Sequence, residues 1–311
     1  VRVAEDFREG VFDLDARVRD MDTDGVWASV LIPSITFGFA GQKLSMIKDA
    51  ELALASVRAY NDYLYDDVKG RHPDRFVCSQ APWLRDPTEG AKEIRRNAAR
   101  GFSAMLFPEN PERFGFPSIH TRAWDPMFDA CQETGTVLNV HLGTGLGAMS
   151  VSSDSPLPVG KGAFIVNPTL SAIDWVFSGI LLRFPELKVS LTEGGIDFVP
   201  LVYGRLATMF EDTLDGYWDA DITPAEVFLR NFWFAALYDV GAYQFIDEYC
   251  PTHGMVETDY PHVDTMWPHS REHLDGRLAG LGRAAKDRFL FANAAELYRH
   301  PTPDYVLRGT A

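Results

Sequence analysis

The sequence lacks the features that would take it to a membrane or to nucleic acid. No apolar run approaches the roughly 18 residues that a membrane span needs, and the N-terminus shows no signal-peptide pattern. Basic residues form no run either, since 29 Lys and Arg stand against 44 Asp and Glu, a formal net charge of −15. We therefore expect neither a nucleic-acid partner nor a membrane partner, and a soluble cytoplasmic protein.

Cysteine is also scarce. The three cysteines, Cys78, Cys131 and Cys250, are far apart and show no metal-type spacing. They are typical of buried free thiols in a reducing compartment. With 311 residues and 46% hydrophobic content the chain can build a sizeable core. No linker or internal repeat divides it, so we predict a single domain over residues 1–311.

What the sequence does contain is an alternation of apolar strand-like segments with amphipathic helical segments. The predicted strands cover residues 26–32, 76–81, 102–107, 137–141, 187–193, 232–237 and 255–258. The predicted helices cover about 14–24, 46–69, 87–100, 125–133, 168–183, 198–210, 242–249, 271–281 and 293–299, and another begins at Thr223-Pro224. The nearly continuous apolar run 26–32 is typical of a strand buried on both faces. Such alternation indicates parallel β/α units.

The length fits a closed (β/α)8 barrel, the TIM barrel, which typically needs about 250 residues. Seven strands are one too few for that fold. The first strand lies either in the weakly patterned N-terminal segment or upstream of Val1, and we favour the second position.

Three of the predicted strands end in a residue that can bind a metal or move a proton. His141 and Glu193 each lead into glycines, and Pro261 stops ladder pairing just after Asp259. In a parallel α/β sheet or barrel, chemistry collects at these strand ends. Each residue alone could belong to a turn or to the core. Because three coincide, we predict that they lie together, close enough to share a metal.

Several motifs together resemble the amidohydrolase-related family, the branch of the amidohydrolase superfamily that contains aminocarboxymuconate semialdehyde decarboxylase. The motifs are Glu257-Thr258-Asp259-Tyr260-Pro261-His262 with Trp267-Pro268, Thr192-Glu193-Gly194-Gly195, Trp124-Asp125-Pro126 ahead of Val140-His141, and Asn293-Ala294-Ala295-Glu296-Leu297-Tyr298. The resemblance extends from about Asp20 to His300. It implies a (β/α)8 barrel of the metal-dependent hydrolase type, with a divalent metal at its C-terminal mouth.

The resemblance also implies roles for individual residues. His141 would be a metal ligand, and Asp259 would be a ligand or a proton-transfer group. The metal would be zinc, with manganese as the alternative. The sequence departs from the family in two ways: it has no first-strand His-x-His motif, and Glu193 stands where the decarboxylases carry a histidine. Because the first-strand motif is absent, we also keep a metal-free mouth as an alternative.

The chemistry of the residues leaves further choices open. A catalytic zinc needs about three protein ligands and a water, and its charge lowers the pKa of that water toward about 7. Glu193 could be the third ligand or, with Asp259, the group that takes and returns the proton. Its alternative role is structural, as an acceptor for the N–H groups of Gly194 and Gly195. His262, Trp267 and Phe37 are candidate substrate contacts, with packing as the alternative for the two aromatic residues.

These observations favour a metal-dependent hydrolase in which metal-activated water attacks a small molecule. The first alternative is a non-oxidative decarboxylase of a cyclic or unsaturated acid. A second carboxylate at Glu193 disfavours it, because that carboxylate would repel an acidic substrate unless the metal offsets it. The second alternative is an inactive, metal-free barrel. We also expect a homodimer.

Overall fold

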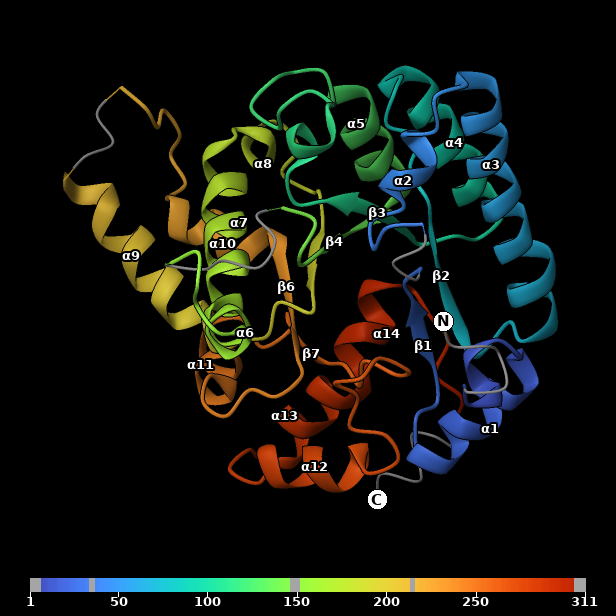
Figure 1. Cartoon of the computed structure of the whole chain (residues 1–311). Coiled ribbons are helices and arrows are strands. Elements are labelled where there is room, and N and C mark those ends of the chain that lie inside the picture. Colours follow the sequence, from blue (N-terminus) through green and yellow to red (C-terminus); the bar gives the residue numbers. More distant parts are fainter. Residues whose placement is uncertain (1–6, 34–36, 146–151, 213–215, 305–311) are drawn as a thin grey trace.

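The computed structural model describes residues 7–33, 37–145, 152–212 and 216–304 (Figure 1). Seven strands form one parallel sheet in which every strand pairs with the next along the chain. They are β1 (Ser29–Leu31), β2 (Phe76–Gln80), β3 (Ala104–Pro108), β4 (Val137–His141), β5 (Val189–Thr192), β6 (Phe232–Ala236) and β7 (Gly254–Val256). Because parallel neighbours need a crossover, helices separate them. The fold is the predicted (β/α)8 barrel type, with seven strands in the described part of the chain.

Helices follow the strands around the outside of the sheet (Figure 1). The longer ones are α1 (Leu14–Asp24), α3 (Ala50–Tyr63), α4 (Pro87–Ala99), α5 (Asp125–Thr134), α7 (Val166–Phe177), α9 (Val199–Asp212), α10 (Pro224–Asn231), α11 (Tyr243–Tyr249) and α12 (Ser270–Arg277). Shorter helices are α2 (Gln42–Ser45), α6 (Leu157–Gly162), α8 (Ile180–Arg183), α13 (Arg283–Asp287) and α14 (Asn293–Leu297). Helix α10 begins with a capping box between Thr223 and Glu226, as the sequence indicates.

The core lies between the sheet and these helices. Strands β2, β3 and β4 are buried along their whole length. Phe107 on β3 meets the rings of Trp124, Phe128 and Trp175 edge to face, at centroid distances of 5.2, 5.5 and 5.7 Å. This geometry is the one that aromatic quadrupoles prefer. The three cysteines are buried and free, as expected.

Helix α14 packs beside the starts of the strands. Leu297 and Tyr298 join a buried cluster with Val77 and Val137, which are early residues of β2 and β4. The hydroxyl of Tyr298 donates to Asn139 Oδ1 at 2.7 Å. Helix α14 therefore covers this end of the sheet. The functional site is expected at the opposite end, where the strands finish.

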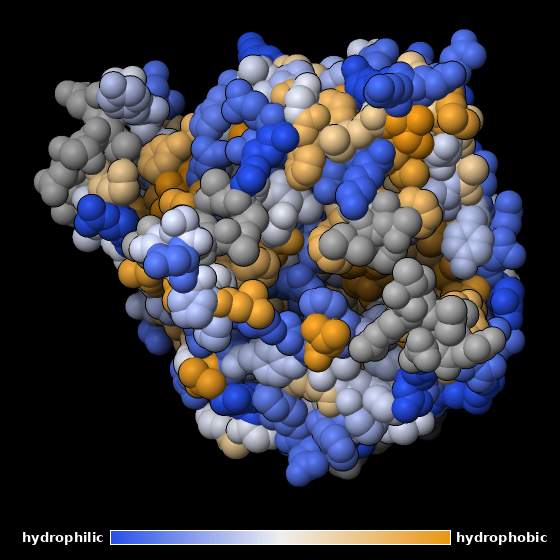
Figure 2. Space-filling model, viewed as in Figure 1, coloured by the Kyte–Doolittle hydropathy of each residue, from blue (hydrophilic) through white to orange (hydrophobic). Residues whose placement is uncertain are grey.

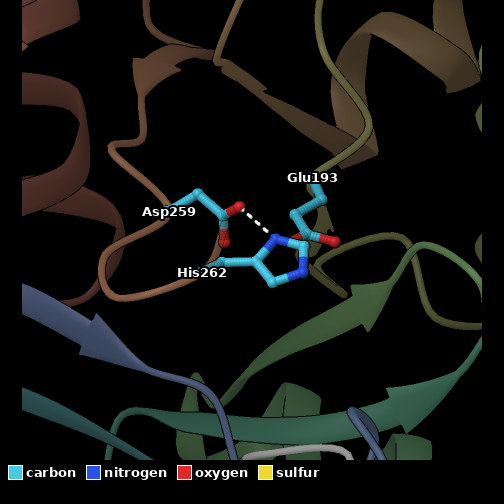
Figure 3. A group of neighbouring side chains, drawn as sticks. All are labelled: Glu193, Asp259 and His262. Carbon is cyan, nitrogen blue, oxygen red and sulfur yellow. Dashed lines mark hydrogen bonds and ion pairs between the residues drawn. The ribbon is translucent and has the colours of Figure 1, made fainter. Parts of the chain in front are cut away.

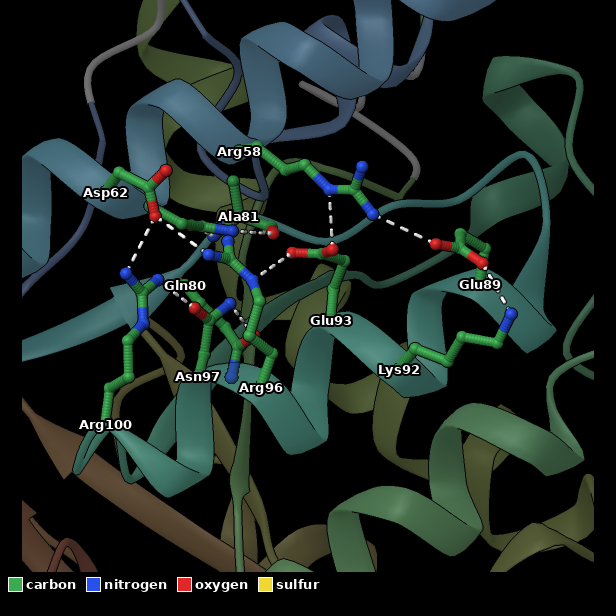
Figure 4. A network of polar contacts seen from close by, with 11 residues as sticks. Arg58, Asp62, Gln80, Ala81, Glu89, Lys92, Glu93, Arg96, Asn97 and Arg100 are labelled. Atoms are coloured by element: carbon green, nitrogen blue, oxygen red, sulfur yellow. Dashed lines mark hydrogen bonds and ion pairs between the residues drawn. The ribbon is translucent and has the colours of Figure 1, made fainter.

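An ion-pair network joins α3 to α4 on the outer surface (Figure 4). Glu93 of α4 is buried and receives Arg58 of α3 at 2.7 Å and Arg96 at 2.9 Å. Asp62 receives Arg96 at 3.0 Å and Arg100 at 2.7 Å. The network links two neighbouring helices and lies apart from the strand ends.

Some sequence predictions were wrong in detail. Strand β1 is shorter than 26–32 and only partly buried, because it has one neighbour, β2, in the described sheet. The helix predicted over 46–69 begins at Ala50 and ends in a π-helix, Leu64–Lys69. The helix predicted over 168–183 begins at Val166 and breaks at Gly179, whose φ of +73° ends α7 before α8.

The C-terminal region also differs from the prediction. Strand β7 ends at Val256 rather than at Thr258. Helix α12 ends at Arg277, and α13 and the π-helix Arg288–Ala292 precede α14. Among the helices of the described residues, none is long and apolar enough to cross a membrane.

Candidate metal and proton-transfer site

Glu193, Asp259 and His262 point toward one another beyond the C-terminal ends of the strands (Figure 3). Each offers one ligand atom, and these atoms all lie within 4.8 Å of one another. His262 Nδ1 is 2.6 Å from Asp259 Oδ2 and 4.0 Å from Glu193 Oε1. Glu193 directly follows β5, and Asp259 comes three residues after the end of β7.

Both carboxylates sit on left-handed backbone. Glu193 has a φ of +58° and Asp259 a φ of +52°. This conformation is uncommon outside glycine, and unusual backbone of this kind clusters at functional sites. It turns the chain sharply just where each acidic side chain is presented.

His141 completes the predicted group of three residues. It ends β4, is 3% exposed, and its Nε2 lies 3.6 Å from Glu193 Oε2. Its Nδ1 lies 2.7 Å from the carbonyl oxygen of Leu142, so Nδ1 carries the proton and donates it there. Burial lowers the pKa of His141 to about 4. The ring is therefore neutral, and its Nε2 lone pair is available to a metal.

A third carboxyl, that of Glu257, was not among the candidates from the sequence. Its Oε2 accepts the backbone N–H of Glu193 at 3.2 Å. Burial, followed by the nearby carboxylates of Asp259 and Asp239, raises the pKa of Glu257 to about 8. Burial and then Glu257 and Asp259 also raise the pKa of Glu193 well above its usual range. Crowded carboxyls of this kind hold protons at neutral pH.

The loop that carries Glu193 is held by Asp239 rather than by Glu193 itself. Asp239 Oδ1 accepts the N–H groups of Ile196 at 2.6 Å and Asp197 at 2.8 Å. Asp197 in turn accepts the N–H groups of Gly241 and Ala242, each at 2.9 Å. Of the two amides that the sequence analysis considered for Glu193, the N–H of Gly194 donates instead to the carbonyl of Leu191 at 3.4 Å.

Glu109, which follows β3, was also missed. Its Oε2 accepts the N–H of Gly145 at 2.7 Å, and its own N–H donates to Thr144 Oγ1 at 2.9 Å. Thr144 Oγ1 donates in turn to the carbonyl of His141 at 2.5 Å. A Cβ at Gly145 would lie 2.9 Å from Glu109, so only glycine fits there. Glu109 therefore fixes the loop behind His141, and burial raises its pKa to about 7.

The aromatic residue at the site is Phe39 rather than Phe37. The Phe39 ring stacks on His141 with centroids 4.6 Å apart and an interplanar angle of 8°. Phe37 instead packs against Tyr60 of α3, at 5.3 Å. The sequence singled out the loop but could not say which of two phenylalanines, two positions apart, faces the histidine.

Trp267 is also placed in packing. Its Nε1 donates to the carbonyl of Asp20 at 3.0 Å, and the guanidinium of Arg8 lies 3.8 Å from its ring centroid. These contacts tie the loop after Asp259 to helix α1 and give Trp267 a structural role.

A sequence profile of the amidohydrolase family matches residues 10–300. The chain belongs to this amidohydrolase family. Among curated proteins it is 25% identical over 251 residues to 2-amino-3-carboxymuconate-6-semialdehyde decarboxylase of Dictyostelium discoideum. That match covers 77% of this chain and 65% of the relative, so the chain spans just under two thirds of the curated protein's length.

Solved structures of similar fold support the architecture of this amidohydrolase-family chain. 5-Carboxyvanillate decarboxylase from Sphingomonas paucimobilis gives a TM-score of 0.73 at 23% identity, covering 92% of this chain and 82% of that one. A dihydroxybenzoic acid decarboxylase from Polaromonas sp. JS666, with bound manganese and the inhibitor 2-nitroresorcinol, gives 0.72 at 20% identity, covering 96% and 90%. At these identities the likeness establishes the fold.

The donor set of this amidohydrolase-family chain fits a divalent metal. The imidazole Nε2 of His141 lies 3.6 Å from Glu193 Oε2, and Asp259 offers a carboxylate oxygen within 4.8 Å of a Glu193 oxygen. Imidazole suits zinc and iron, and carboxylate suits manganese and magnesium, so the mixed set is compatible with either group. His262, hydrogen-bonded to Asp259, would orient that carboxylate as the outer partners of metal ligands commonly do.

Proposed function

We propose that this chain is a metal-dependent, non-oxidative decarboxylase of a small carboxylic acid. The observation that carries the proposal is the cluster of Glu193, Asp259 and His262, with the bare Nε2 of His141 beside it, at the mouth of the barrel. The relatives named above, which are decarboxylases, support this reaction over the hydrolysis that the sequence favoured.

The surroundings of Glu193 weaken the objection to decarboxylation. That objection was that Glu193 would repel the carboxylate of the substrate. Its carboxyl is only 19% exposed and lies against Glu257 and Asp259, and both burial and these neighbours favour its neutral form. A neutral carboxyl does not repel an acid and can donate a hydrogen bond to it.

His141 and Asp259 are the proposed metal ligands, and manganese replaces zinc as the first expectation. When bound, the ion would neutralise the carboxylate of the substrate and act as a Lewis acid. Other residues of the chain position these ligands and shield them from water. His262 holds Asp259 in place, and Phe39 covers one face of His141 and excludes water from it.

We assign to Glu193 the role of the acid that protonates the substrate carbon. In decarboxylation the bond from the carboxyl carbon to the substrate breaks, carbon dioxide leaves, and the electron pair stays on the substrate carbon. That carbon then takes the proton of the Glu193 carboxyl, which becomes a carboxylate and is protonated again from solvent. A positioned acid of this kind contributes typically about 10²–10⁴ in rate.

The test is carbon dioxide release by the manganese-loaded chain from a panel of aromatic and unsaturated acids. Glu193→Gln should lower turnover by about 10²–10⁴ while manganese binding persists. Glu272→Gln, at an exposed position on α12, is the matched control and should leave turnover unchanged. Hydrolysis of the corresponding esters or amides without carbon dioxide release from any acid would contradict the proposal.

A further inference from the structure

The loop from Asp259 to Ser270 carries two members of the site, Asp259 and His262, and joins β7 to α12. It follows the last strand of the sheet, which in the described part of the chain pairs with β6 alone. Within the loop, His262 N–H donates to the Asp259 carbonyl at 2.7 Å, and Thr265 Oγ1 donates to the Thr258 carbonyl at 2.7 Å. These bonds shape the loop itself, so contacts with other elements must fix its place at the mouth.

Helix α1 supplies such contacts to the residue that directly follows Asp259. The Tyr260 hydroxyl donates to Asp20 Oδ2, and Arg17 Nη1 donates to the Tyr260 carbonyl at 3.3 Å. The Arg17 guanidinium also lies 4.7 Å from the centre of the Tyr260 ring. One helix therefore binds both the backbone and the side chain of the residue next to a proposed metal ligand.

The far end of the loop is held against the same helix. Trp267 Nε1 donates to the Asp20 carbonyl at 3.0 Å. Ser270 lies where α12 begins beside α1 (Figure 1), and its N–H and Oγ donate to the two carboxylate oxygens of Asp24 at 2.9 and 2.5 Å. His262 thus lies between two attachments of the loop to α1.

Asp20 is the residue on which these contacts converge. Its side chain is 15% exposed and accepts Arg8 Nη1 at 3.3 Å as well as the Tyr260 hydroxyl. The Arg8 guanidinium in turn lies 3.8 Å from the centre of the Trp267 ring. A Cβ at Gly10 would lie 2.8 Å from the Tyr260 hydroxyl oxygen, so the chain packs closely on the pair. A hydrogen bond to an ionised acceptor is stronger than one between neutral groups.

Polar contacts, rather than the apolar core, join α1 to the loop. Two faces of α1 follow from helical spacing. The apolar face joins the buried cluster around Phe76 of β2 and consists of Leu14, Val18 and Met21. The face toward the loop consists of Arg17, Asp20 and Asp24. Figure 2 shows a mainly hydrophilic surface over the lower part of the view, where α12 lies in Figure 1. Single hydrogen bonds can therefore decide where the loop sits.

We propose that Asp20 is a positioning residue: by binding Tyr260 it fixes the turn that presents Asp259 and His262, and so sets the affinity of the site for manganese. The inference rests on the proposed function in taking Asp259 to be a metal ligand. Loss of an outer partner of a metal ligand typically costs about 10–100-fold in affinity or activity. Asp20 acts through the neighbouring residue, so we expect an effect at the lower end of this range.

The experiment measures manganese binding to the metal-free full chain by calorimetry, well below the unfolding temperature. Asp20→Ala and Tyr260→Phe should each weaken manganese binding about tenfold. The double variant should bind about as weakly as either single variant, because both changes remove the same hydrogen bond. Asp20→Asn should recover most of the affinity, since its amide oxygen can still accept the Tyr260 hydroxyl.

Asp22→Ala is the matched control. Asp22 is an exposed aspartate of the same helix, two positions from Asp20, and pairs with Arg75 at 2.7 Å. Its loss should leave manganese affinity unchanged, whatever it does to the thermal midpoint. If Asp20→Ala and Tyr260→Phe lower the midpoint but bind manganese as the wild type does, Asp20 only stabilises the fold and the inference is overturned. An equal loss of affinity in Asp22→Ala overturns it too. Should Asp20→Ala fail to fold, Tyr260→Phe, which removes a single oxygen atom, decides alone.

Carbon dioxide release, measured separately, distinguishes this inference from the proposed function. Weaker manganese binding in the two variants, without carbon dioxide release by the wild type from any acid, supports the inference and contradicts the proposed function. Carbon dioxide release by the wild type, with unchanged manganese affinity in the variants, overturns the inference alone. A wild-type chain that binds no manganese overturns both.

Discussion

Asp259 combines a strained backbone with the central place in the cluster. Its φ of +52° suits asparagine as well as aspartate, because both tolerate the left-handed region. Its carboxylate bonds to His262 and faces Glu193. An amide at this position keeps the shape but loses the negative charge, so the effects on folding and on chemistry can be separated.

We predict that Asp259→Asn folds normally but loses turnover by about 10²–10⁴, together with manganese binding. The thermal midpoint of the metal-free variant should match that of the metal-free wild type. Turnover and midpoint are measured on the same preparations. Unchanged turnover would remove Asp259 from the mechanism and leave it as a turn residue.

Glu109 gives a pH-dependent prediction. Its pKa in the folded state is about 7, above the ordinary value of 4.5, chiefly because it is buried. Between these pH values the folded chain holds a proton that the unfolded chain has lost. The contribution of Glu109 to stability is therefore complete below about pH 4.5 and declines as the pH rises to about 7.

Glu109→Gln should remove this pH-dependent contribution to the unfolding free energy. The difference in unfolding free energy between wild type and variant should shift by about 1–3 kcal/mol in favour of the variant as the pH rises from about 4.5 to 7. Urea titrations at several pH values measure it, and the shared contributions of other buried carboxyls cancel in the difference. A constant difference across this range would show that Glu109 titrates normally.

At the scale of elements, two loops depend on each other through a pair of aspartates. Asp239, after β6, accepts two amides near the end of the β5–α9 loop, and Asp197 on that loop accepts the amides that precede α11. The loop so held is the one that presents Glu193. Hydrogen bonds to a charged acceptor contribute about 1.5–3 kcal/mol each before the costs of ordering.

We predict that Asp239→Ala lowers the unfolding free energy by about 2 kcal/mol and also weakens substrate binding. The double variant with Asp197→Ala should cost less than the sum of the single changes, since each loop relies on the other. Asp86→Ala, which removes an acceptor of two amides at the start of α4, is the control. It should cost about 1 kcal/mol without affecting the site. Strict additivity would show that the two loops are independent.

At the scale of the whole molecule, metal binding should raise the unfolding free energy of the chain. A ligand that binds only the folded state at 100 times its Kd adds about 2.7 kcal/mol to the unfolding free energy. We expect manganese to raise the thermal midpoint of the wild type in a concentration-dependent way, and a chelator to reverse it. Asp259→Asn should lose this response. An unchanged midpoint at saturating manganese would favour the metal-free barrel.

Much of the fold followed from local patterns. All seven strands and most helices were predicted, because apolar periodicity and turn residues act over a few positions. The errors fell where long-range packing decides. Leu52 and Tyr63 on α3 are apolar yet 57% and 47% exposed, because α3 turns Ala53 and Val57 to the core. The π-helices at Leu64 and Arg288 have no pattern that marks them.

By itself, the sequence determined the edge of the sheet at which His141, Glu193 and Asp259 meet, because parallel strands all finish at one edge and each residue follows an apolar run. Tertiary structure alone decided what surrounds them. The stacking of Phe39 on His141 and the bond from Glu193 to Glu257 join residues 102 and 64 positions apart in the chain. In the sequence, Glu109 likewise looks like an ordinary loop residue, and only the structure shows that Gly145 packs against it. Burial, neutral carboxyls and loop support are properties of such distant contacts, and no local pattern encodes them.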